Sequence, residues 1–76
     1  MVAYVQCRLE QTRPDGRVEV VAWIPERGAK VGAHVELKGK EGLWHVLGAP
    51  GPAIEGSDLS EKQARDRRSL QSIAGA

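Results

Sequence analysis

One cysteine and two histidines are the side chains best suited to metal binding or nucleophilic chemistry. Cys7, His34 and His45 fall on three different predicted strands, and none belongs to a Cys-x-x-Cys or His-x-x-x-His pair. A metal site needs three or four convergent ligands, and a catalytic cysteine needs a histidine base within hydrogen-bond reach. The pattern therefore favours a buried thiol and two scattered imidazoles, and we expect neither a metal site nor a catalytic cysteine.

The run Gly39-Lys40-Glu41-Gly42 combines glycines with a lysine, as phosphate-binding loops do. Such a loop must open a helix, whereas this run lies between two predicted strands and is expected to be a turn. The carboxylates are interspersed with basic residues and form no pair typical of general acid–base catalysis. We therefore expect no enzyme activity, no cofactor and no small-molecule substrate.

Basic residues are concentrated near the C-terminus. Seven residues hold Lys62, Arg65, Arg67 and Arg68, diluted by Asp66. On a helix Arg65 and Arg68 would share a side, because residues three apart are neighbours. Arginine suits carboxylate and phosphate alike, since its planar fork can bond either in two places. The segment is therefore either a solvated helix or a docking element for an acidic protein surface or for nucleic-acid phosphates.

The aromatic residues allow a second kind of binding surface. Tyr4 is predicted on the polar face of the first strand, where it could stack on a base if it lay beside Arg8 and Lys38. The alternative is that Tyr4 merely covers the sheet. Because the chain has no phenylalanine, Trp23 and Trp44 are expected to fill the core on the second face.

Size and charge limit the function classes. A chain of 76 residues buries only about 60% of its unfolded surface, so a deep active site would compete with the core. A formal net charge of +1 creates no global field toward nucleic acid or an anionic membrane, although a local patch remains possible. A lone cysteine excludes an internal disulfide. We find no signal peptide and no apolar run near the ~20 residues of a membrane span, so an intracellular setting is expected.

Alternation of apolar and polar residues predicts strands over residues 2–10 and 17–24, joined by a hairpin at Pro14-Asp15-Gly16. Pro25 ends the second strand. The inward residues are expected to be Ala3, Val5, Cys7, Leu9, Val18, Val20, Ala22 and Ile24. Further strands are predicted at residues 34–38, 43–47 and around 53–55. For residues 43–47 the pattern leaves open which face is inside.

The composition changes after Gly56. Ser60 and Gln63 match a capping box, which predicts a helix over residues 61–73. Its apolar residues form no stripe, so we expect it to fray unless it docks. The expected fold is mainly β: a small SH3-like or related barrel of four to five antiparallel strands over residues 1–56, with a C-terminal helical tail over residues 57–76.

Four runs stand in order along the chain: Trp23-Ile24-Pro25, Ala29-Lys30-Val31-Gly32, Val35-Glu36-Leu37-Lys38 and Gly42-Leu43-Trp44-His45-Val46. They resemble a set of short bacteriophage-encoded proteins, which also end in a basic tail similar to Ala64-Arg65-Asp66-Arg67-Arg68. The resemblance departs at residues 48–56 and at the extreme C-terminus. It implies a phage origin and an accessory role, in the cytoplasm of the infected bacterial host or in the virion.

Together these features predict a non-enzymatic phage accessory protein that binds and modulates a host or phage macromolecular machine, for example the transcription machinery. A nucleic-acid-binding protein and a minor virion structural protein are the alternatives. The expected partner is a host or phage protein, with nucleic acid possible and no membrane. The expected binding residues are Arg27 and Lys30 in the connector between glycines, and Arg65, Arg67 and Arg68 in the tail.

Overall fold

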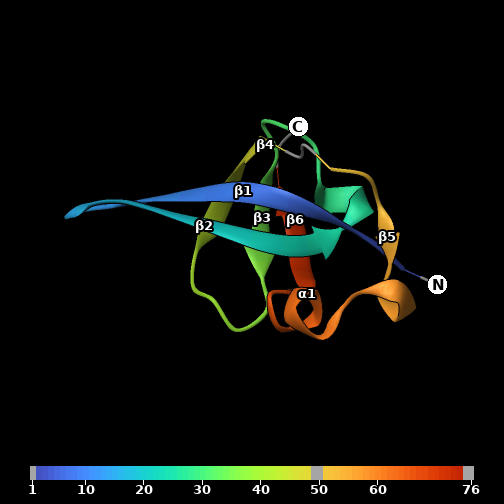
Figure 1. Ribbon diagram of the computed structural model, residues 1–76. Coiled ribbons are helices and arrows are strands. Elements are labelled where there is room, and N and C mark those ends of the chain that lie inside the picture. Colours follow the sequence, from blue (N-terminus) through green and yellow to red (C-terminus); the bar gives the residue numbers. More distant parts are fainter. Residues whose placement is uncertain (1, 49–50, 75–76) are drawn as a thin grey trace.

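The computed structural model describes residues 2–48 and 51–74, which form one antiparallel sheet of six strands (Figure 1). The strands are β1 (Ala3–Arg13), β2 (Gly16–Pro25), β3 (His34–Leu37), β4 (Leu43–Gly48), β5 (Ile54–Glu55) and β6 (Leu70–Ala74). Short helical elements are η1 (Glu26–Gly28), η2 (Gly56–Asp58) and α1 (Glu61–Arg65). The strand order is β2-β1-β4-β3-β6, and β5 pairs with the beginning of β1. The mainly β fold expected from the sequence is confirmed.

The predicted hairpin between the first two strands is also confirmed. β1 and β2 pair from Tyr4 opposite Pro25 to Arg13 opposite Gly16. Gly16 has a φ of 138°, a backbone conformation that glycine adopts without steric cost. β1 pairs with β4 only from Arg8 to Glu10, so the far end of the hairpin projects beyond the rest of the sheet (Figure 1).

The two ends of the sheet approach each other through the segment between α1 and β6. The amide of Trp23 on β2 donates to the carbonyl of Asp66 at 2.9 Å, and the amide of Arg68 donates to the carbonyl of Trp23 at 2.8 Å. A single parallel bridge joins Trp23 to Arg67. No continuous ladder closes the described sheet at this point, but the contact gives the domain a barrel-like shape.

The core lies on the concave face of this sheet. It consists of Val5, Cys7, Leu9, Ala22, Ile24, Ala33, Val35, Leu37, Trp44, Val46 and Leu70. The predicted inward faces are therefore confirmed except at Ala3, which is half-buried outside this cluster. Val18 and Val20 are partly buried at the edge of the core. The structure also decides the face of β4, because Trp44 and Val46 point inward. Trp23 is buried as well, although it lies outside this core cluster.

The predicted helix over residues 61–73 is wrong beyond Arg65. Its start is confirmed, because Gln63 donates to the Ser60 hydroxyl at 3.1 Å and its own side chain accepts from the Ser60 amide at 2.8 Å. The chain then leaves the helix, and β6 pairs with the outer edge of β3. A short helix without an apolar stripe is marginal, whereas β6 gains ladder hydrogen bonds and buries Leu70.

Gly28 makes room for that buried leucine. A Cβ atom at this position would lie 2.7 Å from Cδ1 of Leu70, closer than a carbon–carbon contact allows. The short strand expected around residues 53–55 is confirmed as β5, while residues 49 and 50 of the preceding loop lie outside the described residues. None of the helices in the two described ranges is long and apolar enough to cross a membrane.

Candidate binding surface

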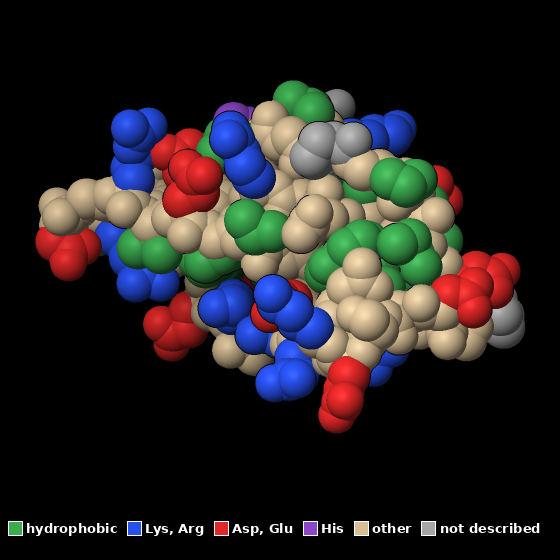
Figure 2. All heavy atoms as spheres, viewed as in Figure 1, with side chains coloured by type: hydrophobic (Ala, Val, Ile, Leu, Met, Phe, Trp, Pro, Cys, Tyr) green, Lys and Arg blue, Asp and Glu red, His purple; other side chains and the backbone are tan. Residues whose placement is uncertain are grey.

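Four basic side chains surround an open hollow of about 370 Å³. The hollow is formed by the turn after β3 and by the segment that leads from α1 into β6. We call it the basic hollow, and its lining residues are Lys38, Gly39, Lys40, Arg67, Arg68 and Ser69. Figure 2 shows lysine and arginine side chains gathered below β2 and beside α1. Two segments almost thirty residues apart in the chain thus build one basic surface.

Backbone hydrogen bonds hold these two segments together. The amide of Lys38 donates to the carbonyl of Ser69 at 2.9 Å and joins the two segments, and the amide of Lys40 donates to the carbonyl of Leu37 at 3.2 Å within the turn after β3. Gly39 has a φ of 83°, which lets the chain turn sharply between the two lysines. The backbone that carries the cations is therefore tied to the sheet rather than left as a free loop.

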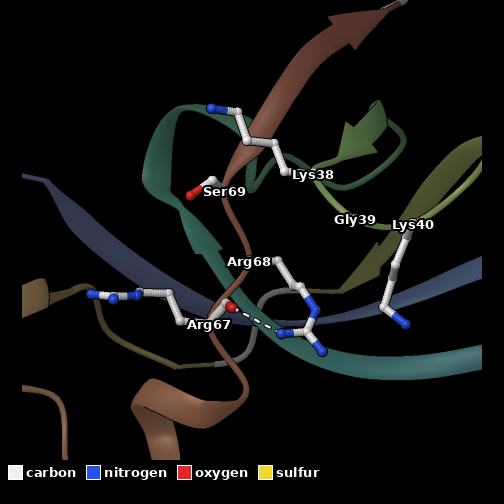
Figure 3. A pocket seen from close by; sticks show the side chains of 6 residues that line it. All are labelled: Lys38, Gly39, Lys40, Arg67, Arg68 and Ser69. Atoms are coloured by element: carbon white, nitrogen blue, oxygen red, sulfur yellow. Dashed lines mark hydrogen bonds between the residues drawn. The ribbon is translucent and has the colours of Figure 1, made fainter.

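The side chains spread the charge over this surface. Arg68 Nη1 donates to the carbonyl of Arg67 at 3.1 Å and to that of Arg65 at 3.4 Å. Figure 3 shows Arg68 and Lys40 extending in the same direction, while Arg67 and Lys38 extend to other sides. An arrangement of this kind suits an extended anionic surface better than a single small anion.

Two of the cations lie over aromatic rings. Lys40 Nζ is 5.6 Å from the centre of the Trp44 ring, and the Arg67 guanidinium is 5.6 Å from the centre of the Tyr4 ring. Both distances are within the range of cation–π attraction. The Tyr4 ring is half-buried, and one of its faces is occupied by Arg67 rather than by Arg8 or Lys38.

The cations of the basic hollow form no ion pair within the described residues. The ion pairs there are Arg17–Glu10 at 2.9 Å and Arg8–Glu19 at 3.9 Å, both on the β1–β2 hairpin. Uncompensated cations on one face create a local positive potential although the net charge is only +1. This surface is therefore the part of the described structure best suited to an anionic partner.

A second depression adjoins the basic hollow and shares Lys40 and Arg68 with it. It has a volume of about 140 Å³ and is lined by Val20, Val21, Ala22, Lys40, Asp66 and Arg68. Val21 is 52% exposed, so an apolar side chain lies directly beside the cations. The combined surface is mainly basic, with an apolar border and the acidic residue Asp66 in its lining.

The structure brings together only part of the predicted binding set. Arg67 and Arg68 line the basic hollow, and Arg65 ends α1 beside them. Arg27 in η1 and Lys30 after it are exposed but do not line the hollow. Lys38 and Lys40 were not among the binding residues expected from the sequence, although both line the hollow. The Lys-Gly-Lys turn directly after a predicted strand was the signal that could have identified them.

The chemistry considered for Cys7 finds no support in its surroundings. Cys7 is a fully buried free thiol, and this burial raises the pKa of the Cys7 thiol to about 11. The thiolate, which is the nucleophilic form, is therefore disfavoured at neutral pH. No group of three or more His, Cys, Asp or Glu side chains in the described ranges is arranged to hold a metal ion.

Fold and surface together define a small barrel-like β domain with a basic, partly apolar face. Comparison with protein-family models, with curated proteins and with solved structures found no match for this chain.

Proposed function

We propose that this protein is a binding module that docks on an acidic segment of a partner protein through the basic hollow. The observation that carries the proposal is that Lys38, Lys40, Arg67 and Arg68 line one open surface and form no ion pair with a carboxylate in the described structure. Complementary charge of this kind steers a partner to its site and fixes the orientation of the complex.

The neighbouring apolar residues favour a protein over a nucleic acid as the partner. Val21 borders the cations and is half exposed, so it offers a contact for an apolar side chain of an acidic segment. The one candidate stacking residue, Tyr4, already lies against Arg67, and Trp23 and Trp44 are buried. Binders of single-stranded nucleic acid instead present exposed aromatic platforms.

The resemblance to short phage-encoded proteins supports a particular kind of partner. A phage accessory protein of this size acts by contacting a larger assembly, and we propose a host or phage macromolecular machine such as the transcription machinery. The buried thiol with its raised pKa supports a non-enzymatic mode of action, in which the surface binds and the partner's activity changes.

A labelled acidic peptide tests the surface directly. The probe alternates Glu or Asp with Leu over about twelve residues, which in extended form span about 40 Å, close to the longest dimension of the protein, 38 Å. We expect the double variant K40E/R68E to bind at least about tenfold more weakly, a loss of about 1.4 kcal/mol. Fluorescence anisotropy at about 0.15 M salt, where the Debye length is about 8 Å, measures this.

The connector supplies a matched control. The variant R27E/K30E changes the same residue types and the same total charge, at exposed positions outside the hollow. We expect its affinity to stay within about twofold of the wild type, as for an ordinary surface substitution. Equal losses in the two variants would refute the basic hollow as the docking surface and would favour the connector.

Nucleic-acid binding is the second candidate, favoured by the guanidinium groups of Arg67 and Arg68, each of which can bond a phosphate in two places. A labelled single-stranded oligonucleotide in the same assay separates the two functions. A polyanion releases counterions at each phosphate contact, so its affinity would fall steeply as salt rises from about 50 to 200 mM. Tighter binding of the oligonucleotide than of the acidic peptide would overturn the protein-partner proposal.

A further inference from the structure

The two histidines, which the sequence scatters, stand side by side on the outer face of the sheet. His34 on β3 is directly opposite His45 on β4. Their rings stack with centroids 4.7 Å apart and an angle of 9° between planes. His34 is exposed and His45 is half-buried. They are the only histidines in the chain, and neither lines the basic hollow.

A row of acidic residues continues from this pair across the sheet. Glu10 on β1 is opposite His45, and Glu19 on β2 is opposite Glu10. The Glu10 carboxylate forms an ion pair with Arg17 at 2.9 Å. It is therefore engaged by that arginine and is not available as a metal ligand. Glu19 is 3.9 Å from Arg8. The metal-ligating groups at this place are therefore the two histidine imidazoles. The negative charge of Glu10 and Glu19 beside them is partly compensated by arginine.

The backbone holds the two imidazoles at a separation that suits chelation. The amide of Val46 donates to the carbonyl of Ala33 at 2.9 Å, directly beside the pair, and this bond fixes the register of the two strands. A metal bound to two imidazole nitrogens at about 2.0–2.1 Å each requires those nitrogens to be at most about 4.2 Å apart. The stacked rings hold their in-plane nitrogen lone pairs nearly parallel, so shared binding of one ion requires the imidazoles to rotate about their side-chain torsions while the strand pairing stays as it is.

We propose that His34 and His45 form a two-ligand site for a divalent transition-metal ion of the imidazole-preferring class, Cu²⁺, Ni²⁺ or Zn²⁺. Two imidazoles leave the remaining coordination positions to water, which agrees with the absence of any three-residue ligand group in the described ranges. The ion would clamp β3 to β4. This site does not depend on the acidic-partner function, because its ligands lie outside the basic hollow.

Calorimetric titration of the full chain with Ni²⁺, in a buffer that does not bind metals, tests the site. We expect one ion per chain and a rise in melting temperature with metal concentration, because the ion binds the folded pairing of the strands. Loss of an outer partner of a metal ligand already weakens binding about 10–100-fold, so H34A and H45A should each weaken it at least about tenfold. The double variant H34A/H45A, which has no imidazole, should bind no ion.

Electron paramagnetic resonance of the Cu²⁺ complex gives an independent readout, since two bound imidazoles produce nitrogen couplings that one cannot. Coupling to two imidazole nitrogens in the wild type and to one in each single variant would support the site. Any one of three results would overturn it: no binding at up to about 1 mM Ni²⁺, unchanged affinity in the double variant, or coupling to a single imidazole in the wild type. Circular dichroism confirms that each variant is folded.

Discussion

The β1–β2 hairpin and the basic hollow carry similar basic side chains but differ in how those charges are compensated. On the hairpin, Glu10 lies directly opposite Glu19, a like-charge pairing that would destabilise the sheet. Each carboxylate has an arginine partner, Arg17 and Arg8 respectively. The hollow's cations have no carboxylate partner within the described residues. Arg13 at the end of β1 also has no carboxylate partner there and donates to Gln11 instead, so what distinguishes the hollow is that unpaired cations from two distant segments share one surface.

The two regions also differ in how closely they are packed against the hydrophobic core. The basic hollow rests on the core, because Lys40 lies over Trp44 and Ser69 precedes the buried Leu70. Beyond Glu10 the two strands of the hairpin pair only with each other, and the Gln11 side chain donates to the carbonyl of Glu41 in the turn before β4. A two-stranded hairpin alone is marginally stable in water. Core substitutions should therefore disturb the hollow far more than they disturb the hairpin.

Truncating Trp44 should give the largest effect. Trp44 is 1% exposed, and W44A should lower the free energy of unfolding by about 3–5 kcal/mol through lost burial and a new cavity. The half-buried Val18 of the hairpin provides the contrast, since V18A should cost less than about 1.5 kcal/mol. Urea unfolding measures both. Similar losses in the two variants would show that the hollow has no better support than the hairpin.

The Trp44 indole also has a buried Nε1 that finds no hydrogen-bond partner among the described residues. W44F keeps most of the ring and removes this donor, whose burial without a partner costs about 1–3 kcal/mol. We therefore expect W44F to be much less destabilised than W44A. Equal destabilisation would mean that the indole nitrogen contributes to stability.

Alkaline pH should weaken the core beneath the hairpin by a smaller amount. Burial raises the pKa of the Cys7 thiol from 9.0 to about 11. Between these values the folded state holds a proton that the unfolded state loses, so stability falls as pH rises. The loss should reach about 2 kcal/mol at pH 11.

The variant C7A isolates this effect because every other titrating group is retained. Urea unfolding at about pH 8 and pH 11 should show a larger loss in the wild type than in C7A, by the roughly 2 kcal/mol expected from the thiol. The same pH dependence in both proteins would contradict the role assigned to Cys7.

Removing the cap of α1 should have a moderate effect that reaches the hollow and not the hairpin. The Ser60 hydroxyl accepts from the Gln63 amide, and α1 leads directly into Arg67 and Arg68. S60A should cost about 1 kcal/mol of stability and S60D much less, because aspartate also caps helices. Amide hydrogen exchange should increase over residues 61–68 in S60A and at Trp23, whose amide donates to Asp66, while the other β1–β2 amides are unchanged. Increased exchange throughout the sheet would argue that the cap supports the whole domain.

Breaking an ion pair on the hairpin should have the smallest effect. The Arg17 side chain is 74% exposed, and exposed pairs contribute about 0.2–1 kcal/mol. R17A should lose this amount at low salt and almost none at about 1 M salt, where the Debye length is about 3 Å. R68A serves as the comparison, because it removes no carboxylate partner. Thermal unfolding at both salt concentrations distinguishes them, and a salt-independent loss in R17A would contradict the ion-pair explanation.

Local patterns predicted the strands well because each pattern is set by neighbouring residues. Alternation placed Val5, Cys7 and Leu9 in the core, and Pro25 ended β2 where its missing amide cannot join a ladder. The capping box located the start of α1. The end of this helix was predicted wrongly, because the edge of β3 that captures residues 70–74 is a non-local feature.

The candidate sites required the same non-local information. Arg67 and Arg68 were identified from their local density, but Lys38 and Lys40 join them only because β6 pairs with β3 and brings the two segments together. The stacked histidines depend likewise on the register of β3 and β4. A one-residue change in that register would turn every side chain of one strand to the other face.

By itself, the sequence determined the β class, the hairpin and the inward faces of β1 and β2, because alternation and turn chemistry act over a few residues. Only the tertiary structure decided that Trp44 joins the main core while Trp23 is buried outside it, that the tail becomes a strand, and that four cations share one surface. The physical reason is that these outcomes depend on the hydrogen-bonding edge of β3 and on the space beneath the sheet. Both exist only when distant segments have come together.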